Sequence, residues 1–154
     1  MTVFGRATLM TGLVTIVAAQ VIAAQTPAVR LVELTGNDLM KYSVTAIAAK
    51  PGELLHVRLK NVGTLPKVAM AHNFVLLAKG TDPAAFTNAA ATAGATGYIA
   101  PAMKAKVLAS TPMAGAGETV DVTFKAPAAP GVYTFLCTFP GHFLSGMKGT
   151  LTVK

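Results

Sequence analysis

One segment of the chain carries three side chains that can bind a soft metal within eleven residues. It runs from Cys137 through His142 to Met147 and offers a thiolate, an imidazole and a thioether. A second imidazole, His72, stands at the start of the apolar run that follows Asn73. Two imidazoles, one thiolate and a weak thioether are the ligand set of a blue-copper site. The sequence therefore predicts one type 1 copper ion held by His72, Cys137, His142 and Met147.

The mixture of ligands indicates what such a site would do. Thiolate and thioether favour Cu(I), imidazole serves both oxidation states, and a trigonal site with a weak axial sulfur is a compromise between the two geometries. A site that need not rearrange exchanges electrons quickly, and four side-chain ligands leave no open position for a substrate. We therefore expect a one-electron carrier and not an enzyme.

The other histidine and the other methionines have simpler interpretations. His56 alternates with Leu55 and Val57 and shares the polar face of a strand with Arg58 and Lys60, so we interpret it as a surface residue. Met40 and Met113 are interpreted as core filling.

Other functions for the same residues stay open. A copper carrier or scavenger without an electron-transfer role would need the same ligands. Zinc also suits two histidines and one cysteine, although the methionine and the Phe-Pro-Gly loop favour copper. Multicopper enzymes need further histidines, and only His56 is left. A cysteine hydrolase would need an activated thiol in a substrate cleft, which no pattern indicates.

The amino terminus has the pattern of a secretory signal. Residues 1–24 contain one charged residue, Arg6, followed by an apolar run that ends in small residues before Gln25. We expect a signal peptide at 1–24, one domain at 25–154 and export to the periplasm; an uncleaved anchor facing the periplasm is the alternative. An exported chain normally pairs its cysteines, but Cys137 is the only one here, so it is a buried inert side chain, a nucleophile or a metal ligand.

The net charge gives a weak indication of which partners the protein binds. Of 13 Lys and Arg residues, 12 remain without Arg6, against 6 acidic residues, a net charge of +6. Because the basic residues are scattered, nucleic-acid binding is not expected, and a preference for acidic partners is the milder inference.

Short β-rich runs between turn signals must position these ligands. We expect strands at 29–34, 42–47, 53–60, 73–77, 106–108, 119–124, 131–137 and 147–153. Asp82 and Pro83 can cap and start one short helix at about 83–92, inserted between strands. The expected fold is all-β: an antiparallel Greek-key sandwich of about eight strands with one inserted helix.

The chain resembles the azurin and auracyanin branch of the cupredoxins, which are small blue copper electron carriers. The resemblance lies in Leu65-Pro66-Lys67, in Met70-Ala71-His72-Asn73-Phe74-Val75-Leu76, and in Phe135 to His142 with Met147 to Leu151. It implies His72, Cys137 and His142 as equatorial ligands and Met147 as the axial one. It also implies that Asn73 ties the two ligand loops together, and that the amides of Asn73 and Phe139 donate to the cysteine sulfur.

Two departures from azurins concern the site. Azurins usually have a glycine before the first histidine, and the carbonyl of this glycine approaches the copper. Here the residue is Ala71, and whether its carbonyl makes a weak contact with copper stays open. Met147 follows His142 by five residues, as in auracyanins and plastocyanins, whereas typical azurins use four. The single cysteine also excludes the azurin disulfide.

The resemblance implies that the electron leaves through the ring edge of His142 within an apolar patch. The candidates for this patch are Met70, Pro140, Gly141 and Phe143. We expect brief contacts of a monomer with redox proteins such as cytochromes or a terminal reductase or oxidase, acidic at the docking surface.

Overall fold

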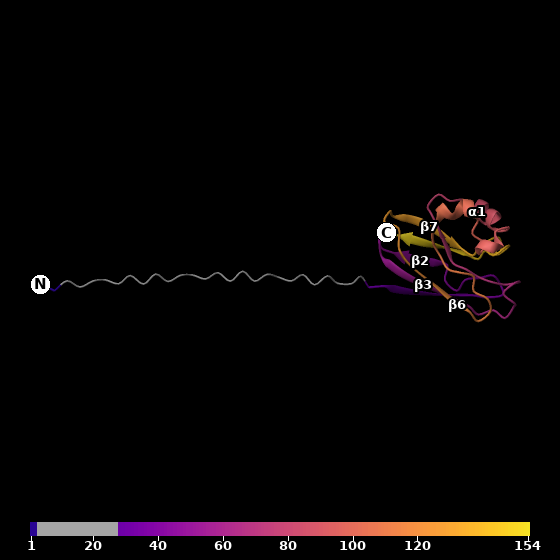
Figure 1. Ribbon diagram of the computed structural model, residues 1–154, viewed down its shortest axis with the longest axis horizontal. Coiled ribbons are helices and arrows are strands. Elements are labelled where there is room, and N and C mark those ends of the chain that lie inside the picture. Colours follow the sequence, from indigo (N-terminus) through magenta and orange to yellow (C-terminus); the bar gives the residue numbers. More distant parts are fainter. Residues whose placement is uncertain (3–27) are drawn as a thin grey trace.

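The computed structural model describes residues 1–2 and 28–154. The expected leader at 1–24 lies almost entirely outside the described residues, and the domain that follows is a sandwich of two sheets (Figure 1). One sheet has three strands in the order β1-β3-β6, and the other has five in the order β2-β8-β7-β4-β5. The strands are β1 (Arg30–Gly36), β2 (Ala46–Ala49), β3 (Leu54–Asn61), β4 (Val75–Leu77), β5 (Val107–Ser110), β6 (Thr119–Lys125), β7 (Gly131–Leu136) and β8 (Lys148–Val153). The predicted sandwich of eight strands is confirmed.

The pairing of the strands differs from the antiparallel prediction. β1 runs parallel to β3, and β2 runs parallel to β8, while the remaining pairs are antiparallel. The chain leaves the first sheet after β1, crosses to the second sheet as β2, and returns to the first sheet beside β1. Because apolar alternation reports only which face of a strand is buried, it does not reveal the direction of the neighbouring strand.

The second predicted strand is shorter than expected. Tyr42 makes only an isolated bridge with Gly36, and regular pairing begins at Ala46. The buried Tyr42 ring instead lies 5.8 Å from the Phe135 ring, and its hydroxyl donates to the carbonyl of Asn73. This part of the pattern therefore reflects a buried side chain in a loop and not a strand.

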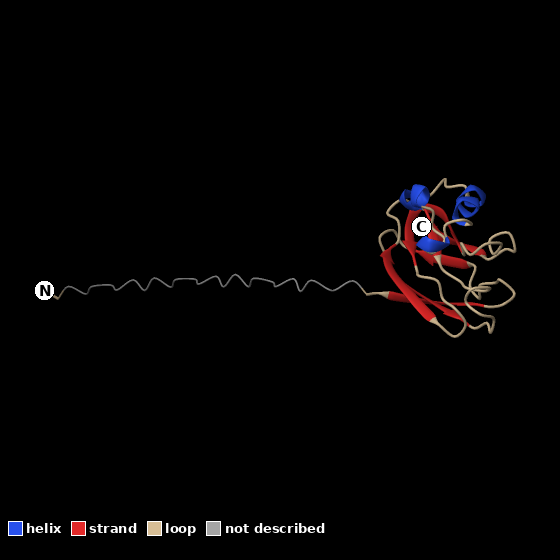
Figure 2. Ribbon diagram, turned by 45° about the vertical axis from the view of Figure 1, so that its right-hand side comes forward, coloured by secondary structure: helices blue, strands red, loops and turns tan. Residues whose placement is uncertain are grey.

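The helix falls where the sequence places it. Helix α1 (Pro83–Ala90) begins at the Asp82 cap, whose carboxylate accepts from the amides of Ala84 and Ala85. Two 3₁₀ helices that were not predicted follow, η1 (Gly94–Thr96) and η2 (Pro101–Lys106). The helical segments lie together beside the five-stranded sheet, away from β3 and β6 (Figures 1 and 2).

The core lies between the two sheets and reaches up to the predicted metal ligands. Leu55, Val57 and Leu59 of β3 point inward and are fully buried, as their alternation predicted. Cys137 and Met147 belong to the same apolar cluster. Between residues 28 and 154, no helix is long and apolar enough to cross a membrane.

Candidate metal centre

The loop between β7 and β8 brings three of the predicted ligands to one end of the sandwich. Its two ends are joined because the Cys137 amide donates to the Met147 carbonyl at 3.1 Å. The Met147 amide in turn donates to the His142 carbonyl at 3.0 Å. Gly141 and Gly146 take positive φ angles of 84° and 91°, which let the chain turn tightly between the ligands. The spacing of Cys137, His142 and Met147 thus follows from one closed loop.

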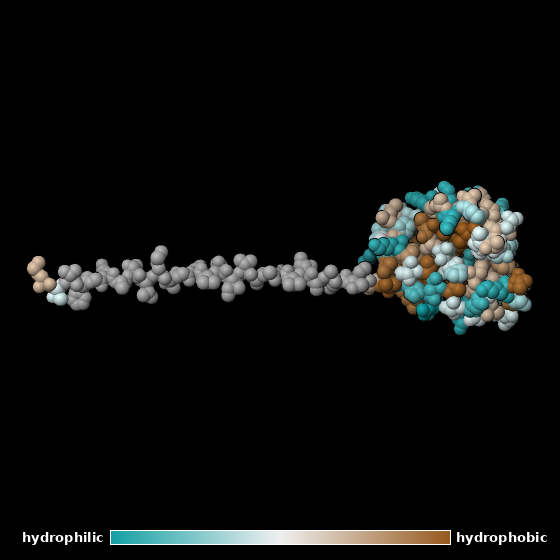
Figure 3. Space-filling model, viewed as in Figure 1, coloured by the Kyte–Doolittle hydropathy of each residue, from teal (hydrophilic) through white to brown (hydrophobic). Residues whose placement is uncertain are grey.

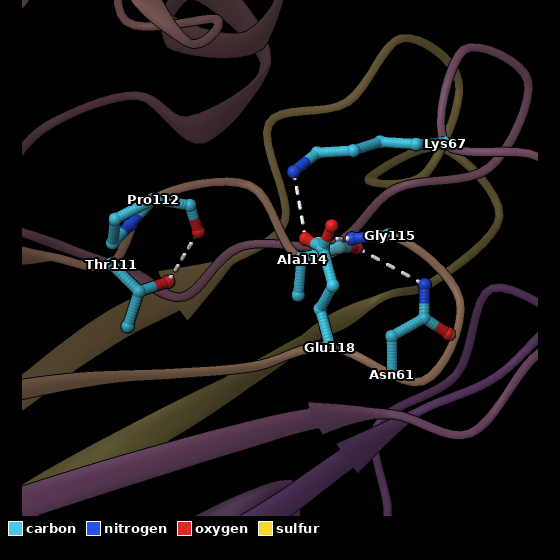
Figure 4. Close-up of polar contacts among 7 residues, drawn as sticks. All are labelled: Asn61, Lys67, Thr111, Pro112, Ala114, Gly115 and Glu118. Carbon is cyan, nitrogen blue, oxygen red and sulfur yellow. Dashed lines mark hydrogen bonds and ion pairs between the residues drawn. The ribbon is translucent and has the colours of Figure 1, made fainter.

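A second loop holds His72 in place. The His72 amide donates to the Ala114 carbonyl at 3.0 Å, and the Ala114 amide donates back at 2.7 Å. The buried Asn61 side chain also donates to the Ala114 carbonyl, at 3.1 Å (Figure 4). Glu118 accepts from the Gly115 amide at 2.9 Å and pairs with Lys67 at 2.7 Å (Figure 4). His72 is therefore fixed by its backbone before any metal binds.

The ligand atoms of the three strongest donors converge. His72, Cys137 and His142 are all buried, and their ligand atoms lie within 4.8 Å of one another. The two Nδ1 atoms are 3.2 Å apart, and the sulfur is 3.4 Å from Nδ1 of His142. Two buried imidazole nitrogens and a thiol facing one another are suited to one soft or borderline cation.

Met147 lies close to the His72 ring, beside Gly36. It is fully buried, and a methyl group added to Gly36 would stand 2.9 Å from the Met147 Cε atom and 2.7 Å from Cδ2 of His72. The thioether and the His72 ring therefore both pack on the Gly36 backbone. This arrangement leaves room there for a glycine only.

Burial keeps the metal-free ligands uncharged. It raises the pKa of the Cys137 thiol to about 12, although hydrogen bonds from the amides of Asn73 and Phe139 oppose the rise. Burial, together with the nearby His72, lowers the pKa of His142 to about 4. Burial also lowers the pKa of His72, while the Asn37 carbonyl and the Asp38 carboxylate oppose this shift. A bound cation would reverse the balance at the sulfur and hold it as thiolate.

The residues expected around the ligands lie beside them. The amides of Asn73 and Phe139 face the sulfur, as the resemblance implied. The side chain of Asn73 donates to the Thr138 hydroxyl at 2.8 Å and accepts from the Thr138 amide at 2.9 Å, which ties the two ligand loops together. The Ala71 carbonyl is 3.8 Å from the sulfur and so borders the site.

The expected exit patch is only partly at the surface. Pro140 and Gly141 are exposed and Phe143 is half-buried, but Met70 is only 9% exposed. Met70 closes a turn in which its amide donates to the Pro66 carbonyl, and its side chain packs inward. Leu144, which the sequence analysis did not single out, is 80% exposed.

His56 and the other methionines lie apart from the site. His56 is on β3, where Nε2 is 2.8 Å from an oxygen of Asp121 that also accepts from Arg58 at 2.9 Å. Met40 packs against the edge of the core, and Met113 is half-buried. The structure therefore places His56 in a polar surface cluster, in line with its interpretation.

Several residues that shape the site were missed by sequence reasoning. They are Gly36, Asn61, Ala114 and Thr138. Thr138 directly follows the cysteine, so its position in the motif was a signal that could have been used. The others lie outside the ligand motifs, at the ends of β1 and β3 and in the loop between β5 and β6, and nothing in the local pattern marks them.

A two-sheet sandwich with two buried histidines, a buried cysteine and a methionine at one end defines the class of small single-copper proteins. The comparisons agree. Residues 28–154 match the model of the copper binding proteins of the plastocyanin/azurin family, and the chain belongs to this family. It is a blue copper protein whose cofactor is copper, and His72, Cys137, His142 and Met147 are arranged as a type 1 copper site.

Both auracyanins and azurins are similar to this chain. Auracyanin-B of Chloroflexus aurantiacus is 38% identical over 130 residues, which cover 84% of this chain but only 54% of that protein. An azurin of Pseudomonas denitrificans is 37% identical over 126 residues, or 80% of this chain and 97% of that one. The solved structure of auracyanin A of Chloroflexus aurantiacus, described as a "blue" copper protein, superimposes with a TM-score of 0.72 at 34% identity. That match covers 82% of this chain and all of the other.

Proposed function

We propose that this protein carries single electrons between redox proteins in the periplasm, entering and leaving through His142. The observation that supports this most is the closed ligand set. All four ligand side chains are buried, and His72, Cys137 and His142 already converge without a metal. Copper, when bound, supplies a one-electron couple. The protein holds the ligands still, which keeps the reorganisation on electron transfer small, and offers no open position to a substrate.

The exit follows from the exposure of the ligands. His72, Cys137 and Met147 have no exposed surface, whereas His142 keeps 2%. His142 also lies in the loop whose neighbours Pro140 and Gly141 are exposed. An incoming partner would therefore come nearest to the metal over this loop.

The surface beside His142 has the shape of a small contact site. A shallow hollow of about 150 Å³ lies between helix α1 and the ligand loop. It is lined by Thr87, Asn88, Ala91, Thr138, Phe139, Pro140, Gly141, Phe143 and Leu144. A small, largely apolar contact of this kind suits brief encounters better than permanent association.

Basic residues border the ligand loop and favour an acidic partner. Lys148 Nζ lies 4.7 Å from the centroid of the Phe143 ring, and Lys41 donates to the carbonyl of Ser145. Neither lysine is paired with a carboxylate among the described residues. On the face shown in Figure 3, hydrophilic and hydrophobic residues are interspersed. Steering by these two lysines would act mainly on the association rate and would weaken with salt.

Electrochemistry tests the proposal against a copper carrier or scavenger. The copper-loaded protein should give a reversible one-electron wave, and it should keep its copper during repeated cycles against a competing chelator. An irreversible wave, with copper lost to the chelator on each reduction, would instead favour a carrier. Mass spectrometry of the exported protein would test whether residues 1–24 are removed.

A further inference from the structure

A chain of ring contacts links the ligand His142 to a distant surface turn. The centroid of the Phe139 ring lies 4.8 Å from that of the His142 ring, and the centroid of the Tyr98 ring lies 5.2 Å from that of Phe139. Tyr98 belongs to the turn between η1 and η2, and both it and Phe139 are half-buried. Tilted rings at these distances attract one another beyond simple burial.

The backbone at Tyr98 is strained. Its φ angle is 60°, in the left-handed region that residues other than glycine and asparagine rarely adopt. The preceding Gly97 has a φ angle of 66°. Such a conformation persists only where the surroundings fix it. Here the Tyr98 amide donates to the Ala93 carbonyl at 2.9 Å, and the Thr96 hydroxyl donates to the Ile99 carbonyl at 2.8 Å. The turn thus keeps Tyr98 in an unfavourable backbone conformation, which places its ring beside Phe139.

We propose that Tyr98 is a positioning residue for the copper ligand His142 and acts through Phe139. The Tyr98 ring limits the positions open to Phe139, which in turn limits the tilt of the His142 imidazole. The two half-buried rings also form the outer wall that keeps water from this side of the ligands. This inference rests on the copper site of the proposed function, but not on which partners the protein serves.

The direction of the effect follows from charge. With a thiolate ligand and two neutral imidazoles, the oxidised centre carries one more positive charge than the reduced one. Water favours the more highly charged state, so opening the wall stabilises Cu(II) and lowers the reduction potential. At a fixed ambient potential, the ratio of Cu(I) to Cu(II) should therefore fall several-fold when the ring is removed.

Three substitutions at Tyr98 separate the effect of the aromatic ring from that of the strained backbone. Tyr98→Phe keeps the ring and loses only a hydroxyl that makes no hydrogen bond within the described residues. Tyr98→Gly and Tyr98→Asn remove the ring but suit the left-handed backbone, so both are expected to fold. Phe124→Leu is the control: its ring stacks on Phe74 in the core and has no ring contact with Phe139.

The readouts are the Cu(I) to Cu(II) ratio in a redox titration, and the ring signals of Phe139 and His142 in nuclear magnetic resonance spectra of the metal-free protein. Tyr98→Gly and Tyr98→Asn should lower the ratio and move both ring signals, while Tyr98→Phe and Phe124→Leu should change neither. Unchanged values in the glycine and asparagine variants, or an equal shift in either of the other two, would overturn the inference. A wild-type protein without a copper centre would overturn the proposed function as well.

Discussion

The side chain of Asn73 and the backbone and hydroxyl of Thr138 share a buried pair of hydrogen bonds, which joins the residue after His72 to the residue after Cys137. The pair sets the separation of two ligands that come from different loops. It is formed by the protein alone, so it acts on the metal-free state as well as on the copper-loaded one.

Replacing Asn73 by alanine should therefore weaken both folding and copper binding. The Thr138 amide would be left buried without a partner, which costs about 1–3 kcal/mol of unfolding free energy. Urea unfolding of the metal-free protein measures this loss, and a Cu(II) competition titration measures the affinity. Asn88→Ala, at an exposed position of α1, is the control and should change neither. Equal stability of Asn73→Ala and the wild type would contradict the role given to this pair.

Gly36→Ala should damage the copper site specifically. The added methyl group would stand 2.7 Å from the His72 ring and 2.9 Å from the Met147 methyl, so at least one ligand must move. We expect a weakened blue absorption band and Cu(II) affinity lower by roughly ten-fold or more.

Gly52→Ala provides the matched control for Gly36→Ala. Gly52 has a φ of 73°, and no atom of residues 28–154 lies within 4 Å of an added methyl group, so alanine there strains only the backbone. It should lower stability without changing the spectrum. Identical spectra for Gly36→Ala and the wild type would show that the ligands do not pack on Gly36 as described.

Copper binding near pH 7 should release about one proton. The Cys137 thiol has a pKa of about 12 in the metal-free protein and is protonated, whereas His72 and His142 have lowered pKa values and are already neutral. The only proton to leave is that of the thiol, so copper affinity should rise with pH. Calorimetry in buffers of different ionisation enthalpy counts the protons; release of two or more would contradict the neutral state of the histidines.

The metal-free protein should lose stability as the pH falls from about 6.5 towards 4. The ordinary imidazole pKa of 6.5 applies to the unfolded chain, while folded His142 has a pKa of about 4, so the unfolded state binds more protons in this interval. His72 adds to the effect in the same direction. For His142 the loss is on the order of 2 kcal/mol. Urea unfolding at several pH values measures it, and a stability that is flat over this range would contradict the burial of neutral rings.

Changes at the rim of the ligand loop should alter docking but not the copper site. Lys148→Glu reverses a charge beside Phe143, and Leu144→Glu places a charge on the most exposed apolar side chain of the loop. Both should slow electron exchange with an acidic redox partner, and low ionic strength should enlarge the effect. Lys125→Glu on β6, in the other sheet, is the control. If all three substitutions slowed electron exchange equally, the net charge of the protein would explain the effect, and a docking site at this loop would be contradicted.

The sequence was enough to predict the ligands because their types are rare and their spacing is short. Cys137, His142 and Met147 fall in one loop, so no knowledge of the tertiary fold was needed to bring them together. His72 required the further step that β4, the strand that follows it, lies beside β7, which the pairing of Val75 with Leu136 provides. The position of α1 and those of most strands were also predictable, since these elements have their own cap or turn signals.

Contacts between distant loops could not be predicted in this way. Gly36 is a simple strand end in the sequence, and only the fold shows that it touches His72 and Met147. Tyr98 lies in an alanine- and glycine-rich stretch without periodicity, so nothing local indicated its place beside Phe139. The inward packing of Met70 was missed for a related reason, because an apolar residue beside a ligand can face either solvent or core.

The most direct test of the copper centre is a titration of the metal-free protein with Cu(II), followed by visible absorption. His72, Cys137, His142 and Met147 should give an intense thiolate-to-copper band that saturates at one copper per chain. The band should be absent from Cys137→Ser. A colourless Cu(II) adduct, or a band that survives the loss of Cys137, would contradict the assignment.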